Sequence, residues 1–218
     1  MASGALVMGD LVLTETEIVP VMTKLLANGI DVTALHNHLL RANPPTYYMH
    51  VHAHGDPVTL ATAIRAALGE SKTPFGPPAA PAPQATQIDL DTLALDEAIG
   101  ARGKVNGGVY QFSVPRKDAV TEGGTPVPPP MGVATVINFQ PTGGGKAAIT
   151  GDFVITTDEV NPVIRALREN DIEVTAIHSH MLNEQPRLFF VHFWANDDVQ
   201  KLAKGLQAAL EMTAMARS

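Results

Sequence analysis

An internal repeat constrains the fold of this chain more than any other feature of its sequence. Shifting the sequence by 142 positions aligns residues 9–70 with residues 151–212 without a gap, and 25 of the 62 aligned pairs are identical. Unrelated sequences would share roughly four such pairs from residue frequencies alone. We therefore interpret the chain as a duplicated unit, and two copies favour a pseudo-twofold arrangement over a solenoid.

The two copies predict the domain organisation. Residues 1–70 form a first, incomplete repeat, residues 71–87 form a proline-rich linker, and residues 88–218 form a second, complete repeat. Proline-rich segments favour extended polyproline geometry, so the linker is expected to be semi-rigid. Residues 88–146 have no counterpart before the first copy. That difference would leave a sheet edge of the first repeat uncovered, and a homodimer formed through this edge is expected.

Each copy reads as strand, helix, strand, strand, helix. The opening strands are predicted at residues 5–13 and 147–155, and a helical apolar period follows each of them. Two further strands are predicted at residues 173–182 and 187–196, and Asp56-Pro57 is a typical start for the last helix of the first copy. The second copy is preceded by a helix at 91–99 and strands at 104–114 and 131–139. The prediction is an α+β fold in which antiparallel sheets pack against helices.

All eight histidines lie in the two predicted strand pairs. Because side chains alternate along a strand, His178, His180 and His192 are expected on one face. That face would also carry Val174, while Ile177 would face the core. A hairpin centred on Gln185 would place His178 directly opposite His192. The first copy repeats the pattern with His36, His38 and His50.

Three imidazoles that converge from neighbouring strands are suitable ligands for a divalent transition metal, with zinc favoured and iron or copper as alternatives. The predicted ligands of the second repeat are His178, His180 and His192. Those of the first repeat are His36, His38 and His50, with His52 or His54. Trp194 and Asn196 replace His52 and His54 in the second copy, so the two sites cannot be equivalent. Asp10 and Asp152 could orient a ligand histidine, or have a role at a strand edge or turn.

The function follows from the use of these histidines, and three alternatives stay open. A metal with an open position would activate water, which indicates a hydrolase or lyase acting on a small polar substrate. A non-catalytic module that binds a metal or a small-molecule ligand is the second reading. In the third, the histidines bond to each other or to the backbone in a metal-free structural protein.

Composition excludes several other classes of function. The net charge of −7 argues against general binding to nucleic acids or anionic membranes. The chain has no cysteine, which removes thiol chemistry, disulfides and cysteine-ligated zinc. No apolar run is long enough to span a membrane, and the first residues do not read as a signal peptide. The location of the protein stays unknown from these observations.

Several long motifs resemble the LppY/LpqO family, bacterial proteins built on a domain of unknown function. They include residues 107–116, 151–154, 159–163, 175–182 and 186–194. The resemblance extends over nearly the whole chain. It implies a domain that occurs twice and proteins that are often exported, and it supplies no established activity.

Overall fold

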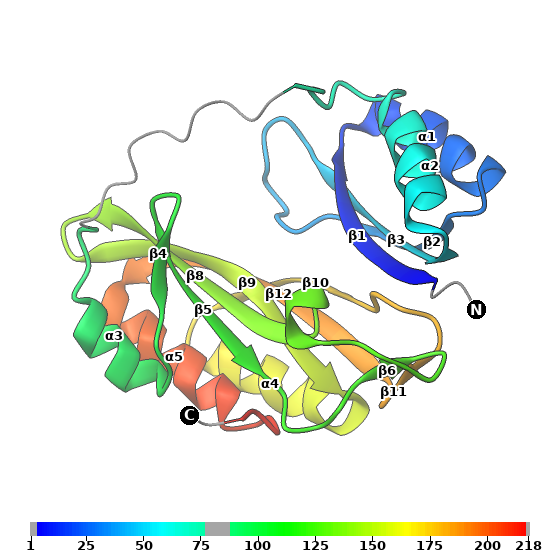
Figure 1. Ribbon diagram of the computed structural model, residues 1–218. Helices are drawn as coiled ribbons and strands as arrows, with labels where there is room; N and C mark the ends of the chain where they lie inside the picture. Colours follow the sequence, from blue (N-terminus) through cyan, green and yellow to red (C-terminus); the bar gives the residue numbers. More distant parts are fainter. Residues whose placement is uncertain (1–3, 77–87, 217–218) are drawn as a thin grey trace. The chain divides into compact units, whose positions relative to one another are not determined.

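A computed structural model describes residues 4–76 and 88–216 of the protein (Figure 1). The chain divides into two compact units. The first contains Met1–Pro78 together with His178–Leu182, and the second contains Ala79–Ile177 and Asn183–Ser218. Both consist of antiparallel sheets packed against helices, so the predicted α+β class is confirmed. Most of the predicted linker, residues 77–87, lies outside the described residues. The pseudo-twofold arrangement stays a prediction.

The first unit has the predicted order of elements. These are β1 (Ala5–Leu13), α1 (Glu15–Ala27), β2 (Asp31–His36), β3 (Tyr47–Gly55) and α2 (Pro57–Leu68). The sheet has the order β1-β3-β2, with every neighbouring pair antiparallel. Helices α1 and α2 pack on each other and share one apolar core with the sheet (Figure 1). Strand β3 is therefore central and β1 is an edge of this sheet; a dimer formed through that edge stays a prediction.

Short polar signals determine where the helices of this unit begin and end. Helix α1 begins after Thr14, whose side chain and backbone form a capping box with Glu17. It is followed by Gly29, which has a φ of +73°. Helix α2 begins after Asp56, whose carboxylate accepts a hydrogen bond from the backbone N–H of Thr59.

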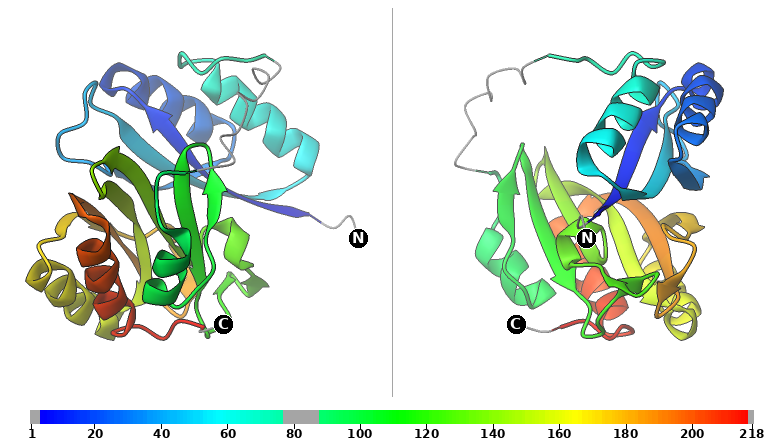
Figure 2. Two further views of the ribbon diagram at one scale, coloured as in Figure 1. Left: turned by 90° about the vertical axis from the view of Figure 1, so that its left-hand side faces the viewer. Right: turned by 45° about the vertical axis from the view of Figure 1, so that its right-hand side comes forward.

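The second unit contains a longer sheet, covered on one face by three helices. Its elements are α3 (Thr92–Ile99), β4 (Lys104–Asn106), β5 (Val109–Pro115), β6 (Thr121–Glu122), β7 (Thr125–Pro126), the 3-10 helix η1 (Pro129–Met131), β8 (Ala134–Gly143), β9 (Lys146–Thr156), α4 (Thr157–Glu169), β10 (Glu173–His178), β11 (Glu184–Gln185), β12 (Leu188–Asp198) and α5 (Val199–Leu210). The six-stranded sheet has the order β10-β12-β9-β8-β5-β4, and β11-β6-β7 form a small separate sheet. Helices α3, α4 and α5 lie together on one face of the long sheet (Figure 2).

Two predictions about the histidine strands were wrong. Strand β2 ends at His36 and β10 ends at His178, so His38 and His180 follow the strands instead of continuing them. Strand β2 also contains a β-bulge: Val32 pairs with Val51, whereas Ala34 already pairs with His50. Residues two apart on a regular strand project to the same face. Because of the extra residue, Val32 and Ala34 are paired with neighbouring residues of β3 and therefore project to opposite faces of the sheet.

In β10 the buried and exposed faces are also exchanged relative to the prediction. Val174, expected on the histidine face, packs against the apolar core of the second unit. Ile177, expected in the core, is 50% exposed. In β12 the predicted core face is correct, since Val191 and Phe193 are fully buried.

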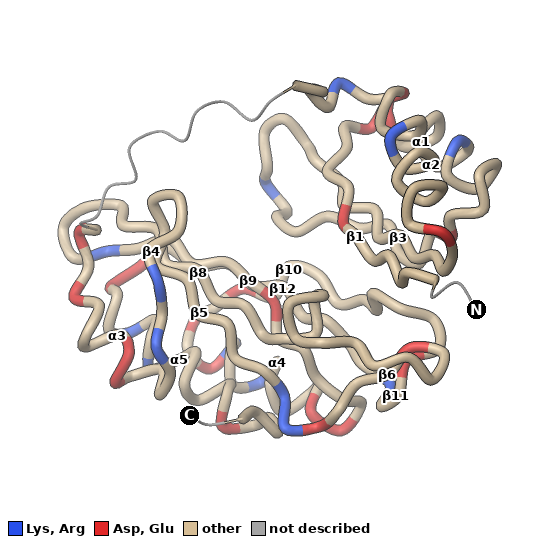
Figure 3. Tube along the Cα trace, in the orientation of Figure 1, with Lys and Arg blue, Asp and Glu red and all other residues tan. Residues whose placement is uncertain are grey.

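Charged side chains of both signs are scattered along the described chain (Figure 3). Strand β3, with the sequence YYMHVHAHG, carries no Asp, Glu, Lys or Arg, so its titratable groups are tyrosines and histidines. Among the described residues, no helix combines the length and the apolar character needed to span a membrane.

Candidate metal centre

Strand β3 supplies the central histidine of the candidate site. His50 is buried, at 6% exposure, and lies between two flanking strands. Across β1 it pairs with Asp10, and across β2 it pairs with Ala34. Because paired residues of an antiparallel sheet project to the same face, Asp10 and His50 share one face of the sheet.

His36 meets His50 diagonally. The sequence predicted that the two would be directly opposite, but His36 pairs with Tyr48, two residues before His50. Diagonal neighbours remain within reach of long side chains. The Nε2 atoms of His36 and His50 lie 2.8 Å apart, and the two rings are nearly parallel, at 4°. A shared zinc ion would hold two such nitrogens about 3.3 Å apart, which requires only a small separation of the rings.

The segment His178–Leu182, which is part of the first unit, supplies a third imidazole. The His178 ring stacks on His36 with centroids 3.4 Å apart, and the His180 ring stacks on His50 at 3.8 Å. The hydroxyl of Thr33, the bulge residue, donates a hydrogen bond to the carbonyl oxygen of His180 and fixes the segment.

Histidine triads of this protein could hold a metal ion. One lies wholly inside the first unit: His36, His50 and His178 each offer a ligand atom, and these atoms lie within 4.8 Å of one another. Of the predicted ligands His52 and His54, the described residues place neither in a group of three such close ligand atoms. His54 is exposed at the end of β3.

Burial favours the neutral form of His36, His38 and His50, which is the form that binds metal. Burial lowers the pKa of His36, and it lowers the pKa of His50 to about 3, with further contributions from the neighbouring His36 and His178. The pKa of His38 is lowered to about 3, chiefly by burial and then by the nearby histidines. Burial also raises the pKa of Asp10 to about 6.

Backbone carbonyls select the tautomer of two triad members. The Nδ1 atom of His36 lies 3.4 Å from the carbonyl oxygen of Asn37, and the Nδ1 atom of His178 lies 3.3 Å from that of Ser179. A carbonyl oxygen can only accept, so in each contact Nδ1 is the donor. Both histidines then carry their lone pair on Nε2, as in metal sites where the second ring nitrogen donates to a carbonyl.

His192 belongs to the second unit and shares two features with His50, namely its burial and an aspartate across the sheet. It is 4% exposed in β12 and pairs with Asp152 of β9, as His50 pairs with Asp10. Its Nδ1 atom donates to the carbonyl oxygen of Gly151 at 3.1 Å. Strands β10 and β12 are neighbours in the sheet, as predicted. The predicted ligand set His178, His180 and His192 stays a prediction.

Tyr48 is a residue of this site that the sequence reasoning missed. The His38 ring stacks on Tyr48 with centroids 3.5 Å apart and an angle of 5° between the planes. Tyr48 precedes His50 by two residues in β3, so the alternation that groups the histidines also indicates the tyrosine. The second repeat has Phe190 at the equivalent position.

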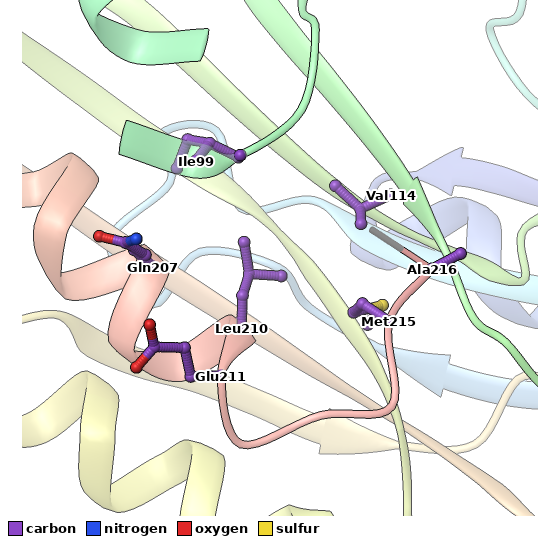
Figure 4. Close-up of a pocket in the computed structure, with 8 residues that line it drawn as sticks. Ile99, Val114, Gln207, Leu210, Glu211, Met215 and Ala216 are labelled. Carbon is purple, nitrogen blue, oxygen red and sulfur yellow. The ribbon is translucent and has the colours of Figure 1, made fainter. Parts of the chain in front are cut away.

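A cavity of about 90 Å³ in the second unit has no histidine among its lining residues (Figure 4). It is lined mainly by apolar side chains of α3, α5, β5 and the C-terminal segment, among them Ile99, Val114, Leu210 and Met215. Gln207 and Glu211 are its polar side chains. Such a lining offers no convergent set of metal ligands, so the histidine cluster is the better candidate for chemistry.

Most of the chain matches a known protein family. The family described as Domain of Unknown Function (DUF1259) matches residues 1–70 and 93–212, which is most of the chain. The chain belongs to this family. The two segments that match DUF1259 are consistent with a duplicated domain.

Other comparisons add little to the DUF1259 assignment. No curated protein matches the sequence. Among solved structures, the trimeric bacterial microcompartment shell protein PduB is similar at 11% identity, with a TM-score of 0.29, over 99% of this chain and 92% of that chain. A TM-score this low supports no statement about fold, assembly or function.

Proposed function

We propose that this protein binds a divalent transition metal through His36, His50 and His178. The observation that carries the proposal is the convergence of three imidazole ligand atoms within 4.8 Å in the first unit. Zinc is the favoured ion, with iron or copper as alternatives, because imidazole suits all three. The lowered pKa values of His36 and His50 and the Nε2 lone pairs of His36 and His178 support it further.

Three histidine ligands leave a position for water or substrate. A metal in such a site lowers the pKa of bound water and polarises carbonyl or phosphoryl groups. The enzymatic version of the proposal is therefore a metal-dependent hydrolase or lyase acting on a small polar substrate. A non-catalytic module that binds a metal or a ligand is the second candidate, and the close stacking of the rings favours it. The resemblance to LppY/LpqO proteins stays a prediction beside the DUF1259 assignment.

Metal content tests the proposal directly. The full chain is purified without an affinity tag, loaded with zinc, dialysed and measured by elemental analysis. We expect about one zinc per chain, lost in His50→Ala and kept in His54→Ala. His54 is the matched control, because it lies in the same strand but outside the triad. No bound metal would leave the metal-free structural role. Equal zinc in both variants would mean that the ion is held by ligands other than this triad.

Turnover separates an enzyme from a binding module. A panel of small esters and phosphoesters is assayed with the zinc-loaded chain. Hydrolysis that a chelator abolishes, and that His50→Ala lacks, supports the enzyme. Stoichiometric zinc without turnover of any member of the panel supports the binding module.

A further inference from the structure

Two elements cover one end of the repeat in the second unit and have no counterpart among the described residues of the first. The shift of 142 positions places β1 on β9, α1 on α4 and α2 on α5. In the second unit β9 pairs with β8, and α5 lies between α4 and α3 (Figure 1). Helix α3 lies over β5, beyond β8, because the hydroxyl of Tyr110 in β5 donates to Asp96 in α3 at 2.8 Å. The open end of the first unit therefore consists of the edge of β1 and the adjoining side of α2.

The side of α2 at the open end is apolar although no described helix of its unit covers it. Ala61 is exposed, and Ile64 and Leu68 are half-buried. Their spacing of three and four residues places them on one side of the helix. The equivalent residues of α5 are all buried and apolar, namely Ala203, Leu206 and Leu210. The first unit thus keeps the apolar side chains that the second unit buries.

The edge of β1 has none of the features that usually prevent an edge strand from pairing. Its nine residues, Ala5–Leu13, include no proline, lysine or arginine, and its pairing with β3 contains no bulge. On the core side, Val7 and Leu11 are half-buried, whereas the equivalent Ile149 and Phe153 are fully buried. A further strand beside β1 would complete this burial.

We propose that the open end binds a second copy of the same chain, with β1 of one copy antiparallel to β1 of the other. The occupant has to supply a strand beside β1 and a helix beside α2. The open end of a second copy presents both, and a twofold axis perpendicular to the sheet keeps all four helices on one face. The two three-stranded sheets then form one sheet in the order β2-β3-β1-β1-β3-β2, which has six strands like the long sheet of the second unit.

The sequence of β1 determines a register for this pairing. Only a register centred on Gly9 pairs all nine residues of both strands. Val7 then lies opposite Leu11 of the second copy, so apolar side chains meet on the core side. Met8 lies opposite Asp10 of the second copy, and Asp10 is the only charged residue of β1. A charge introduced at position 8 therefore reports on the pairing.

The oligomeric state of the full chain tests the proposal. Sedimentation is measured with a chelator present, so that no metal ion bridges two copies, at concentrations up to about 100 µM. We expect a dimer. Met8→Glu places a carboxylate opposite Asp10 twice in the dimer and should raise its dissociation constant about tenfold, whereas Met8→Lys should lower it.

Two further variants test the helix side of the interface. Ala61→Glu places a charge between the two α2 helices and should also weaken the dimer about tenfold or more. Val19→Glu is the control, because Val19 is 70% exposed on α1, and α2 lies between α1 and the open end. It should leave the dissociation constant unchanged.

Hydrogen exchange of the unaltered chain keeps the test independent of how the variants fold. Amides of β1 should exchange more slowly at high than at low protein concentration, and amides of β2, at the other edge of the sheet, should not change. A monomer at every concentration would overturn the proposal. A dimer with equal dissociation constants in Met8→Glu, Met8→Lys and Val19→Glu would overturn it as well, because the copies would then meet through another surface.

Discussion

Two glycines at equivalent positions of the repeats differ in how much space surrounds them. A Cβ atom added at Gly151 would lie 1.9 Å from the carbonyl oxygen of Val136 and 3.0 Å from the ring of Phe193. At Gly9 the nearest atom, in the side chain of Val51, would lie 3.4 Å away. The reason is topological: β9 has a strand on each side, whereas β1 has a partner only in β3 among the described residues of its sheet.

The same substitution should therefore have unequal effects. Gly151→Ala forces a backbone carbonyl to move, and we expect it to cost more than about 3 kcal/mol of the free energy of unfolding. Gly9→Ala should stay within about 1 kcal/mol, because 3.4 Å is close to an ordinary contact distance. Urea unfolding followed by circular dichroism measures both variants. Equal losses would show that the second sheet relaxes around an added methyl group.

At the scale of elements, the sequence predicted the order of helices and strands and the grouping of the histidines. Alternation grouped His50 with the other histidines of the candidate site, and it correctly assigned Val191 and Phe193 to the core. Two features escaped it. The bulge at Thr33 depends on hydrogen bonding between strands, and the ends of β2 and β10 depend on where a partner strand stops. Neither feature could be predicted from the pattern of apolar and polar residues.

The ion pair at the start of α4 determines a pH-dependent part of the stability of the second unit. The buried Arg116 guanidinium donates to Glu159 at 2.6 Å and to Asp118 at 2.7 Å. Burial by itself would raise the pKa of Glu159, but the hydrogen bonds from Arg116 and from the backbone N–H groups of Thr156 and Ala214 outweigh it and lower that pKa.

Substituting Arg116 should reveal how much the ion pair contributes to the free energy of unfolding. Arg116→Met leaves the Glu159 carboxylate buried without its cation, and we expect a loss of about 3 kcal/mol at pH 7. Because the folded pKa of Glu159 is lowered, its stabilisation is present above the unfolded value of 4.5 and disappears as the pH falls through the folded pKa. Below pH 4.5, the free energy of unfolding of Arg116→Met should therefore fall less steeply with decreasing pH than that of the unaltered chain. Trp194, the only tryptophan, lies in β12 and reports unfolding of this unit by fluorescence.

Glu17 offers the control for the same motif. It forms the equivalent capping box with Thr14 in the first unit, but accepts from the backbone N–H of Lys72 instead of an arginine. Glu17→Gln should therefore leave the fluorescence transition of Trp194 unchanged. Equal acid profiles of the unaltered chain and Arg116→Met would contradict the assignment to the Arg116–Glu159 pair.

At the scale of the whole molecule, the two units have cores of different size. The described core of the first unit contains 10 buried apolar residues, and that of the second contains 25. A smaller core buries a smaller share of its surface and gives less stability. The first unit, which carries the candidate metal centre, is therefore expected to open more readily than the second.

This difference makes local protection a sensitive test of where the ion binds. A ligand that binds only the folded form stabilises it by about 2.7 kcal/mol at 100 times its dissociation constant. Zinc bound by His36, His50 and His178 should thus slow amide hydrogen exchange of β1 and β3 about 100-fold. Exchange in β5 and β8 of the second unit should stay unchanged, and His50→Ala should abolish the effect. Equal slowing in both units would contradict binding of the ion by this triad, whose ligand atoms lie in the first unit.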